Sequence, residues 1–482
     1  MNDSQRPGRA ASHAATHAPR TSHSAKSQTT RSQTARSQTS KSRPSRDGRP
    51  ARVVITGLGV VSPIGVGRQA FWKSLAGGQT GISRITTIPS ESLPTKLAAE
   101  VADFDPAEYV YQKKFLKVMS RDIQLGVSAA SLAMQDAGLK AGDLEPTRLG
   151  VEFGAGHISF TPQELAEAAR DYADPTQRDG YPRWGEEPGA ASRPSESDGR
   201  GPLGKIAPLW LLRQLPNMPA CHVAIEHDAQ GPNNTITGGD ASALLALAEA
   251  MRVIERDDAD AMIVGACSSQ LNPIELARMS VCGQLSQADD PAEAPRPFDL
   301  RRDGTIAGEG AAVLVIERYE SAVARGADIY GEVLAVSAGC DGRKQDGAGL
   351  ANAMSAALRG SGVSAGELGH INAHGVGLTQ DDIVEAAAYR RALGDAAGNV
   401  PVTALKSYFG NFDAGAGAVE LAGSILSLRH GITPQSLHYR LPDPRCRLNV
   451  VWDGPQSLAS RTVMSVNRTL LGQSGAAIVR AL

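Results

Sequence analysis

The chain has 482 residues, of which 41% are hydrophobic and 21% charged, and its formal net charge is -2. Residues 1–50 carry ten Lys or Arg and two acidic residues, a balance of +8, so the remaining chain carries -10. The acidic body argues against nucleic acid as a partner.

The apolar and cysteine patterns exclude further classes of protein. No apolar run reaches the roughly 18 residues of a transmembrane helix, so we expect no membrane association. The five cysteines contain no CxxC pair, which argues against a disulfide framework and against a zinc or other metal site. Their scatter favours a reducing compartment, and we expect a cytoplasmic protein.

Residues 1–50 form a basic, low-complexity tail that we predict to be disordered. It contains the repeat KSQTT, RSQTA, RSQTS and too few large apolar side chains to offset the entropy of ordering. An Arg- and Ser-rich tail with few acidic residues is also typical of an organelle transit peptide.

The ordered body is predicted to begin at Arg52. Arg52–Thr56 (RVVIT) has the pattern of a buried strand, and the glycines Gly57 and Gly59 predict a turn after it. The third glycine of a dinucleotide-binding fingerprint is replaced by Ser62, which argues against a nucleotide site.

The rest of the chain alternates helices and short apolar strands. Helices are predicted at Asp122–Ala137 and Ala241–Ile254, and strands at Met262–Val264 and Val313–Ile316. Residues 170–204 are polar and aperiodic, which predicts an exposed insertion. The alternation predicts a layered α/β architecture.

Four segments carry a family resemblance when they are taken together in this order and spacing. The segments are Gly231–Asp240 (GPNNTITGGD), Arg296–Gly310 (RPFDLRRDGTIAGEG), Asn372–Glu385 (NAHGVGLTQDDIVE) and Lys406–Glu420 (KSYFGNFDAGAGAVE). They resemble the beta-ketoacyl synthases, which are the condensing enzymes of fatty acid and polyketide synthesis. The resemblance extends from Arg52 to Leu482.

The resemblance implies a thiolase fold, an α/β fold in which two similar halves build five αβαβα layers, usually in a dimer. We expect the halves at residues 51–326 and 327–482. The family uses no cofactor of its own, because its substrates are carried on the phosphopantetheine of an acyl carrier protein. The retained acids Asp299, Glu309, Asp382, Glu385 and Glu420 are predicted to form buried hydrogen-bonded pairs that shape the core.

The resemblance also implies four catalytic positions, of which this chain keeps two. The family has a nucleophilic Cys at a helix N-terminus, where the helix dipole lowers the pKa of the thiol. This chain has Asp240 at that position. His374 and Lys406 match the first family His and the family Lys, whereas Asn411 replaces the second His.

These substitutions leave several roles open. Asp240 is predicted to cap the following helix, although a nucleophilic Asp is an alternative whose acyl product would be an energetically uphill anhydride. His374 has either a residual catalytic role or only packing and hydrogen-bonding duties. Asn411 can donate a hydrogen bond but cannot titrate, so proton transfer there is lost.

The acyl-binding positions also differ from the family pattern. The two Thr residues that bind the phosphopantetheine arm are replaced by Val376 and Leu378. The glycine-rich gating loop aligns with Leu470, Leu471, Gly472 and Gln473, which predicts a stiffer loop. Cys267, in a motif that looks like the family nucleophile, is predicted to be a small packed residue.

The leading hypothesis is a subunit that does not condense, similar to a chain-length factor paired with an active ketosynthase. Such partners typically carry Gln at the nucleophile position, so Asp240 is a departure. A second hypothesis is a decarboxylase, hydrolase or acyltransferase that uses Asp240, His374, Asn411 and Lys406. A third is an acyl-binding homodimer without catalysis.

Overall fold

The computed structural model describes residues 51–482 except 90–92, 94, 157–159, 161–163, 167–205 and 343–344. The predicted tail at residues 1–50 and the predicted insertion at residues 170–204 lie outside the described residues. The body forms one compact unit by its internal contacts.

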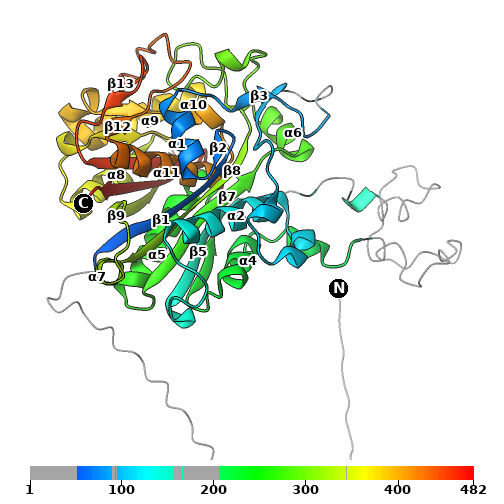
Figure 1. Cartoon of the computed structure of the whole chain (residues 1–482). Helices are drawn as coiled ribbons and strands as arrows, with labels where there is room; N and C mark the ends of the chain where they lie inside the picture. Colours follow the sequence, from blue (N-terminus) through cyan, green and yellow to red (C-terminus); the bar gives the residue numbers. More distant parts are fainter. Residues whose placement is uncertain are drawn as a thin grey trace, which may run out of the picture. The chain divides into compact units, whose positions relative to one another are not determined.

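A single sheet of 12 strands runs through the body (Figure 1). Its order is β13-β11-β10-β15-β16-β9-β1-β8-β7-β5-β6, and β2 pairs with β1. The strands of the first half are β1 (Val53–Ser62), β2 (Gly65–Val66), β5 (Leu149–Ala155), β6 (Asn233–Ile236), β7 (Ala261–Ser269) and β8 (Glu309–Arg318). Those of the second half are β9 (Gly331–Cys340), β10 (His370–Asn372), β11 (Pro401–Thr403), β13 (Asn449–Val450), β15 (Thr462–Arg468) and β16 (Gln473–Arg480).

The two halves of the sheet repeat one topology. In the first half β1, β8 and β7 are antiparallel neighbours, and β5 and β6 then follow in parallel. In the second half β9, β16 and β15 are antiparallel neighbours, and β10 and β11 follow in parallel. The halves meet at a short seam between β1 and β9. The chain is therefore internally duplicated.

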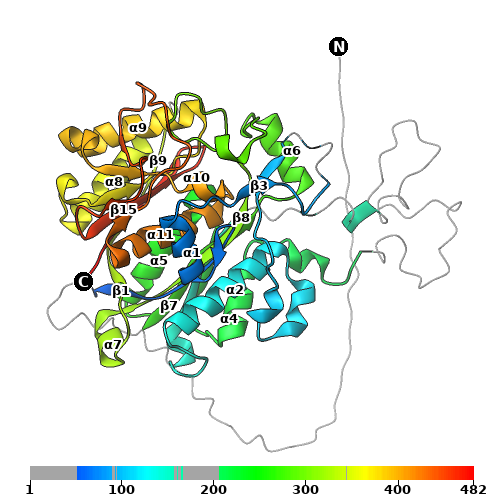
Figure 2. The same ribbon diagram turned by 45° about the horizontal axis from the view of Figure 1, so that its top comes forward.

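Helices complete five layers, with one pair between the two half-sheets (Figures 1 and 2). α2 (Arg121–Asp136) and α4 (Met218–His227) cover the first half-sheet, and α8 (Ala348–Ser361) and α9 (Thr379–Leu393) cover the second. Between them lie α5 (Ser242–Glu255) and α11 (Ala414–His430).

Shorter elements connect these layers. The remaining helices are α1 (Arg68–Ala76), α6 (Pro273–Val281), α7 (Tyr319–Ala324) and α10 (Lys406–Phe409). Two small sheets pair β3 (Ile82–Arg84) with β4 (Leu97–Ala99) and β12 (Ile432–Thr433) with β14 (Gln456–Ser457). Short 3-10 helices include η2 (Lys113–Val118), η5 (Trp210–Arg213) and η6 (Gly239–Ala241). None of the helices in the described residues is long and apolar enough to cross a bilayer.

The composition of the middle helices explains their position. Residues 414–428 of α11 are all buried, and this helix is Ala-, Gly- and Leu-rich with Ser as its main polar residue. A helix that is apolar on every side is stable only where it is enclosed on every side. The middle layer therefore holds the largest core cluster, which contains residues from both halves.

The predicted turn at the first glycines is wrong. β1 continues from Val53 to Ser62 through Gly57 and Gly59. A Cβ atom on Gly59 would lie only 2.0 Å from the carbonyl oxygen of Ala129, which belongs to α2. These glycines therefore allow a helix to approach the strand closely and do not turn the chain.

A buried acid on β5 predicts a pH-dependent stability. Glu152 is 2% exposed, its Oε1 has no hydrogen-bond partner in the described part of the chain, and burial raises its pKa to about 7. Because the folded state binds this proton more tightly than the unfolded state, its stabilising contribution is present at low pH. That contribution is lost as the pH rises through about 7.

We therefore expect Glu152→Gln to raise the free energy of unfolding at pH 8 by about 2 kcal/mol and to change it little at pH 5. Urea denaturation at both pH values measures this difference. An equal gain at pH 5 and pH 8 would contradict the assignment of the effect to proton binding.

Candidate active site

Asp240 lies in a short 3-10 turn between β6 and α5, where the middle layer begins. The turn η6 spans Gly239–Ala241, and Gly239 adopts a φ of 56°, a left-handed conformation that suits glycine. The backbone N–H of Gly238 donates to Ser242 Oγ over 2.8 Å. This turn separates Asp240 from the first residue of α5.

The prediction that Asp240 caps α5 is wrong. The helix begins at Ser242, its cap residue is Ala241, and no side chain makes a capping hydrogen bond there. The reason is the inserted 3-10 turn, which places Asp240 two residues before the helix. Its Oδ1 atom is buried and has no hydrogen-bond partner among the described residues.

Lys406, His374 and Glu420 form a buried network beside Asp240. Lys406 Nζ donates to Glu420 Oε1 over 2.7 Å and lies 3.3 Å from His374 Nδ1. An ammonium group only donates hydrogen bonds, so His374 Nδ1 accepts and the ring proton is on Nε2. Asn467 Nδ2 donates to the other Glu420 oxygen over 2.7 Å. The Lys406 ammonium is thus held between Glu420 and His374, and Asn467 holds Glu420 in place.

The charge states follow from this burial. Burial and the nearby cations Lys406 and Arg468 hold the pKa of His374 well below its usual range, so the imidazole stays neutral. Burial raises the pKa of Asp240 against the opposing effects of Lys406 and of a hydrogen bond from the Asn411 side chain. Burial also raises the pKa of Glu420 to about 7. A neutral His374 can donate a hydrogen bond from Nε2 but brings no positive charge to the site.

Asn411 contacts Asp240 from the loop between α10 and α11. Its backbone N–H donates to the carbonyl of Ile306 over 2.8 Å, and its side-chain Oδ1 is buried without a partner in the described residues. The structure therefore brings the four predicted residues Asp240, His374, Lys406 and Asn411 together at one end of the middle layer.

Asp413 is a member of this site that sequence reasoning missed. It immediately precedes α11, and its φ of 56° is unusual for a residue with a side chain. A Cβ atom on Gly239 would lie 3.3 Å from Asp413 Oδ1, so the carboxyl lies against the turn that carries Asp240. Burial and the charge of Asp240 raise its pKa to about 7. The only signal in the sequence is an acid two residues after Asn411.

The two acids stand at equivalent places in the duplicated halves. α5 and α11 are the two middle-layer helices, and each has an acid just before its first turn: Asp240 before α5 and Asp413 before α11. Neither acid makes a side-chain capping hydrogen bond.

The predicted gating loop is a short turn between β15 and β16. Thr469 N–H donates to the Gln473 carbonyl over 2.8 Å, and Gly472 N–H donates back to the Thr469 carbonyl over 2.9 Å. Leu470 and Leu471 point outward and are 38% and 71% exposed. These two bonds close the turn, and its greater stiffness stays a prediction.

Two buried residues, Arg468 and Asp341, support this turn. Arg468 is buried and binds Asp381 over 2.8 Å and Asp341 over 3.2 Å. Asp341 N–H also donates to the Gly472 carbonyl over 3.0 Å. Movement of Gly472 would have to break this hydrogen bond to Asp341.

The other predicted positions have mainly packing roles. Val376 is buried and Leu378 half-buried in the loop after β10, and neither side chain offers a hydrogen bond to a phosphopantetheine arm. Cys267 is buried in β7, where burial raises the pKa of its thiol well above the usual range. This thiol is a packed residue, as predicted.

The retained scaffold acids are buried and hydrogen-bonded, as predicted. Asp382 accepts from the backbone N–H of Phe298 over 2.7 Å, and Glu385 accepts from that of His374 over 2.8 Å. Glu309 accepts from Arg121 over 2.7 Å. These bonds fix the loops that carry the site.

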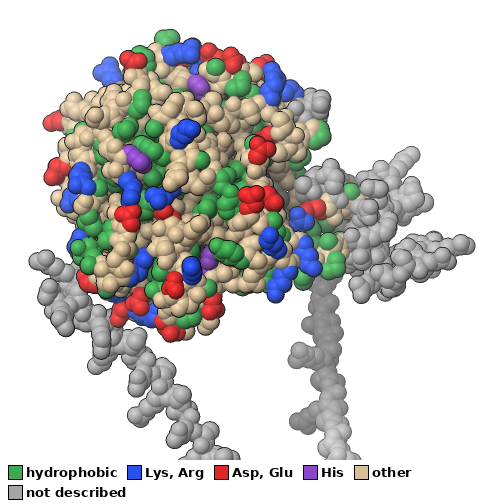
Figure 3. All heavy atoms as spheres, viewed as in Figure 1, with side chains coloured by type: hydrophobic (Ala, Val, Ile, Leu, Met, Phe, Trp, Pro, Cys, Tyr) green, Lys and Arg blue, Asp and Glu red, His purple; other side chains and the backbone are tan. Residues whose placement is uncertain are grey.

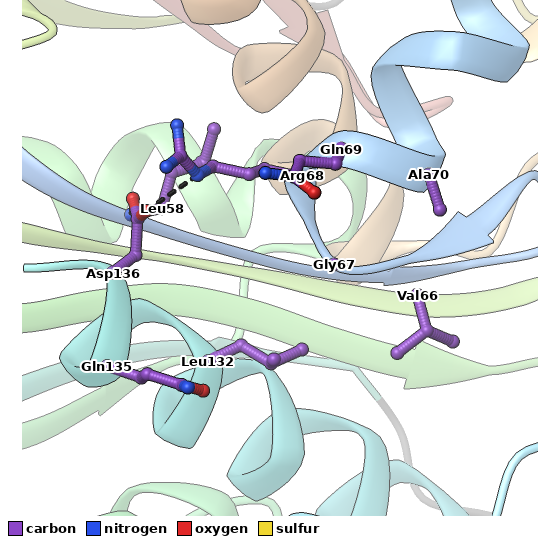
Figure 4. A pocket seen from close by; sticks show the side chains of 9 residues that line it. All are labelled: Leu58, Val66, Gly67, Arg68, Gln69, Ala70, Leu132, Gln135 and Asp136. Carbon is purple, nitrogen blue, oxygen red and sulfur yellow. Dashed lines mark hydrogen bonds and ion pairs between the residues drawn. The ribbon is translucent and has the colours of Figure 1, made fainter.

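A hollow on the surface lies away from this site (Figure 4). It measures about 540 Å³ and lies between the start of α1 and the end of α2. Arg68 Nε binds Asp136 across it over 2.6 Å. Its lining contains none of the site residues.

Comparison with known proteins identifies the family. The chain matches the family model "Beta-ketoacyl synthase, N-terminal domain" over residues 51–322 and "Beta-ketoacyl synthase, C-terminal domain" over residues 330–440. The chain belongs to the beta-ketoacyl synthase family.

Members of this family resemble the chain over most of its length. It is 33% identical to the actinorhodin polyketide putative beta-ketoacyl synthase 1 of Streptomyces coelicolor, over 89% of this chain and 88% of that protein. It is also 33% identical to the 3-oxoacyl-[acyl-carrier-protein] synthase 2 of Coxiella burnetii, over 89% of this chain and 98% of that protein.

Solved structures of the beta-ketoacyl synthase family show the same fold. The ishigamide ketosynthase/chain length factor has a TM-score of 0.78 and 28% identity, covering 90% of this chain and 100% of that chain. A type II acyl-carrier protein in complex with its ketosynthase has a TM-score of 0.76 and 28% identity, with the same coverage. The two similar halves, which together build five layers, thus form the thiolase fold of the ketosynthases, as predicted.

Proposed function

We propose that this ketosynthase homologue is a subunit that does not condense and that pairs with an active ketosynthase, in the manner of a chain-length factor. The observation that carries the proposal is Asp240, a carboxyl group at the position where the family has its nucleophilic thiol. An acyl anhydride on Asp240 would be uphill from a thioester, and Asn411 cannot transfer a proton. The residues that hold the fold are retained, whereas two of the four catalytic positions, at Asp240 and Asn411, are replaced.

An open sheet edge supports the pairing part of the proposal. β6 is the terminal strand of the sheet, and its outer backbone groups have no neighbouring strand within the described residues. α4 packs beside β6 and carries an exposed apolar side chain, Ile225. An open edge beside an exposed apolar side chain suits the addition of a strand from another subunit.

A local basic patch supports contact with an acyl carrier protein, an acidic partner in our proposal. Lys113, Lys114 and Lys117 are exposed on η2. On the face shown in Figure 3, basic and acidic side chains intermingle. Three neighbouring lysines concentrate positive charge that steers an acidic partner. A cytoplasmic location belongs to the same proposal.

The proposal is tested by co-expression with an active ketosynthase, followed by incubation with acyl carrier protein that carries a long acyl chain. We expect the two chains to co-purify and intact-mass measurement to find no acyl adduct on this chain. An adduct that disappears in Asp240→Ala would overturn the non-condensing role and favour an active thioester enzyme.

A matched pair of variants tests the interface. The Pro232 carbonyl accepts from Val151 N–H, and alternate residues of a strand bond to opposite sides, so the N–H of Thr235 faces the open edge. We expect Thr235→Pro, which removes that donor, to abolish co-purification and Thr235→Val to retain it. Co-purification of both variants, or a self-associated wild type that binds no ketosynthase, would count against the pairing.

A further inference from the structure

A buried acid lies one strand away from the open edge of the sheet. Glu152 is on β5, the neighbour of the terminal strand β6, and it is 2% exposed. It is paired in register with Val264 on β7, a residue of the middle-layer core cluster. Paired residues in a sheet share one face, so the Glu152 side chain points toward the middle layer, where α5 packs on β5.

The charge of Glu152 is not compensated within the part of the chain that the structure describes. Its Oε1 atom is buried there without a hydrogen-bond partner. The charged neighbour is Glu249 on α5, which raises the pKa of Glu152. Two arginines already bind Glu249, namely Arg256 over 3.0 Å and Arg252 over 3.4 Å. The residue that faces Glu152 from β6 is the uncharged Asn234, and β7 (AMIVGACSS) has no charged side chain.

Asn234 connects this buried acid with the open edge. It is paired in register with Glu152, its side chain donates a hydrogen bond to Glu152, and it is exposed on the terminal strand. The oxygen of an amide that donates in this way is left to accept from another group. A chain that lies along the edge therefore meets an acceptor with a negative charge behind it.

Glu152 lowers the stability of the chain on its own. A buried polar atom without a partner is destabilising, and above pH 7 this group is also charged, so we expect Glu152→Gln to stabilise the chain at pH 8. A residue that lowers stability in this way is expected where another molecule supplies the missing partner.

We propose that the partner subunit places a basic side chain, Lys or Arg, against Asn234 and the Glu152 carboxylate when it adds to the β6 edge. This inference rests on the proposed function, because it names the chemistry by which the partner is recognised. The β6 strand of a second copy (NNTI) has no basic side chain to offer, and that copy would bring a further uncompensated Glu152. A cation from another chain forms a charge-assisted contact that a copy of β6 lacks.

Pairing is then linked to the ionisation of Glu152. Burial and the charge of Glu249 raise its pKa to about 7 in the chain alone, so the carboxyl is mostly protonated at pH 6 and ionised at pH 8. A basic partner binds the ionised form, so pairing at pH 6 has to release this proton. We therefore expect the affinity for the partner to rise about tenfold from pH 6 to pH 8.

Calorimetric titration of the chain with an active ketosynthase at pH 6 and pH 8 measures this affinity. Repetition at pH 6 in two buffers of different ionisation enthalpy counts the released protons. We expect the wild type to release about one proton more than Glu152→Gln. We expect that variant to bind like the wild type at pH 6 and about tenfold more weakly at pH 8. Because the variant is expected to be the more stable chain at pH 8, misfolding does not explain such a loss.

The matched control is Asp228→Asn. Asp228 is an exposed acid at the end of α4, which packs beside β6, and Asn tolerates its φ of 51°. We expect this control to keep the pH dependence of the wild type. If the affinity of Glu152→Gln rises with pH as that of the wild type does, or if the wild type takes up a proton on pairing, the inference is overturned and the pairing stands. Failure of both chains to pair at either pH would overturn the proposed function and this inference with it.

Discussion

Replacement of Lys406 with Met is expected to lower the free energy of unfolding by about 3–5 kcal/mol. The Lys406 side chain is fully buried and binds Glu420 over 2.7 Å, with His374 Nδ1 3.3 Å away. Methionine fills a similar volume, so the loss comes from the charge. Glu420 is left as an uncompensated buried acid, and its pKa, already raised to about 7, rises further.

Urea denaturation at pH 7 measures this loss, and Lys406→Met/Glu420→Gln is the matched control. Glu420→Gln removes the charge that Lys406 neutralises, so we expect the double variant to recover a large part of the loss. A single variant as stable as the wild type, or a double variant less stable than Lys406→Met, would contradict a buried ion pair at this place.

Replacement of Arg468 with Met is expected to lower the free energy of unfolding by about 3 kcal/mol and to loosen the turn between β15 and β16. Arg468 is 3% exposed and binds both Asp341 and Asp381. Asp341 also accepts from the backbone N–H groups of Gly347 and Gly349, over 3.0 and 2.6 Å. Without Arg468, the Asp341 carboxyl is held only by these two amides. The backbone N–H of Asp341, which donates to the Gly472 carbonyl, is then less firmly positioned.

The matched control is Arg445→Met, because Arg445 also binds an aspartate but its side chain is 52% exposed. We expect that control to lose much less stability than Arg468→Met, because solvent screens an exposed ion pair. Hydrogen exchange at residues 469–473 should become faster in Arg468→Met and stay unchanged in Arg445→Met. Equal exchange rates in the two variants would show that Arg468 does not hold the turn.

The sequence predicted the scaffold better than it predicted the site. The scaffold residues could be placed because each matches a motif, and Asp382 and Glu385 bind the backbone groups that such motifs require. The turn predicted at Gly57 and Gly59 is wrong because glycines after an apolar run have two explanations. They occur where a strand ends in a turn, and also where a helix packs closely on a strand that continues. Only the partner helix distinguishes the two cases.

Asp413 and Arg468 could not be predicted because their roles depend on residues far away in the sequence. Asp413 lies against Gly239 and Gly156, and Arg468 reaches Asp341. No periodicity or spacing records such a contact. The capping role predicted for Asp240 is wrong for a related reason. A 3-10 turn of three residues changes where the carboxyl points, and such a turn leaves little trace in composition.

The position of the middle helices has a consequence for cooperativity. α5 and α11 come from different halves of the duplicated chain, yet both belong to one core cluster that also contains residues from β1, β7, β8, β15 and β16. Opening of either half would expose apolar surface on the other. The two halves therefore unfold as one unit although the family model treats them as two, and the site where they meet is intact only when the whole body is folded.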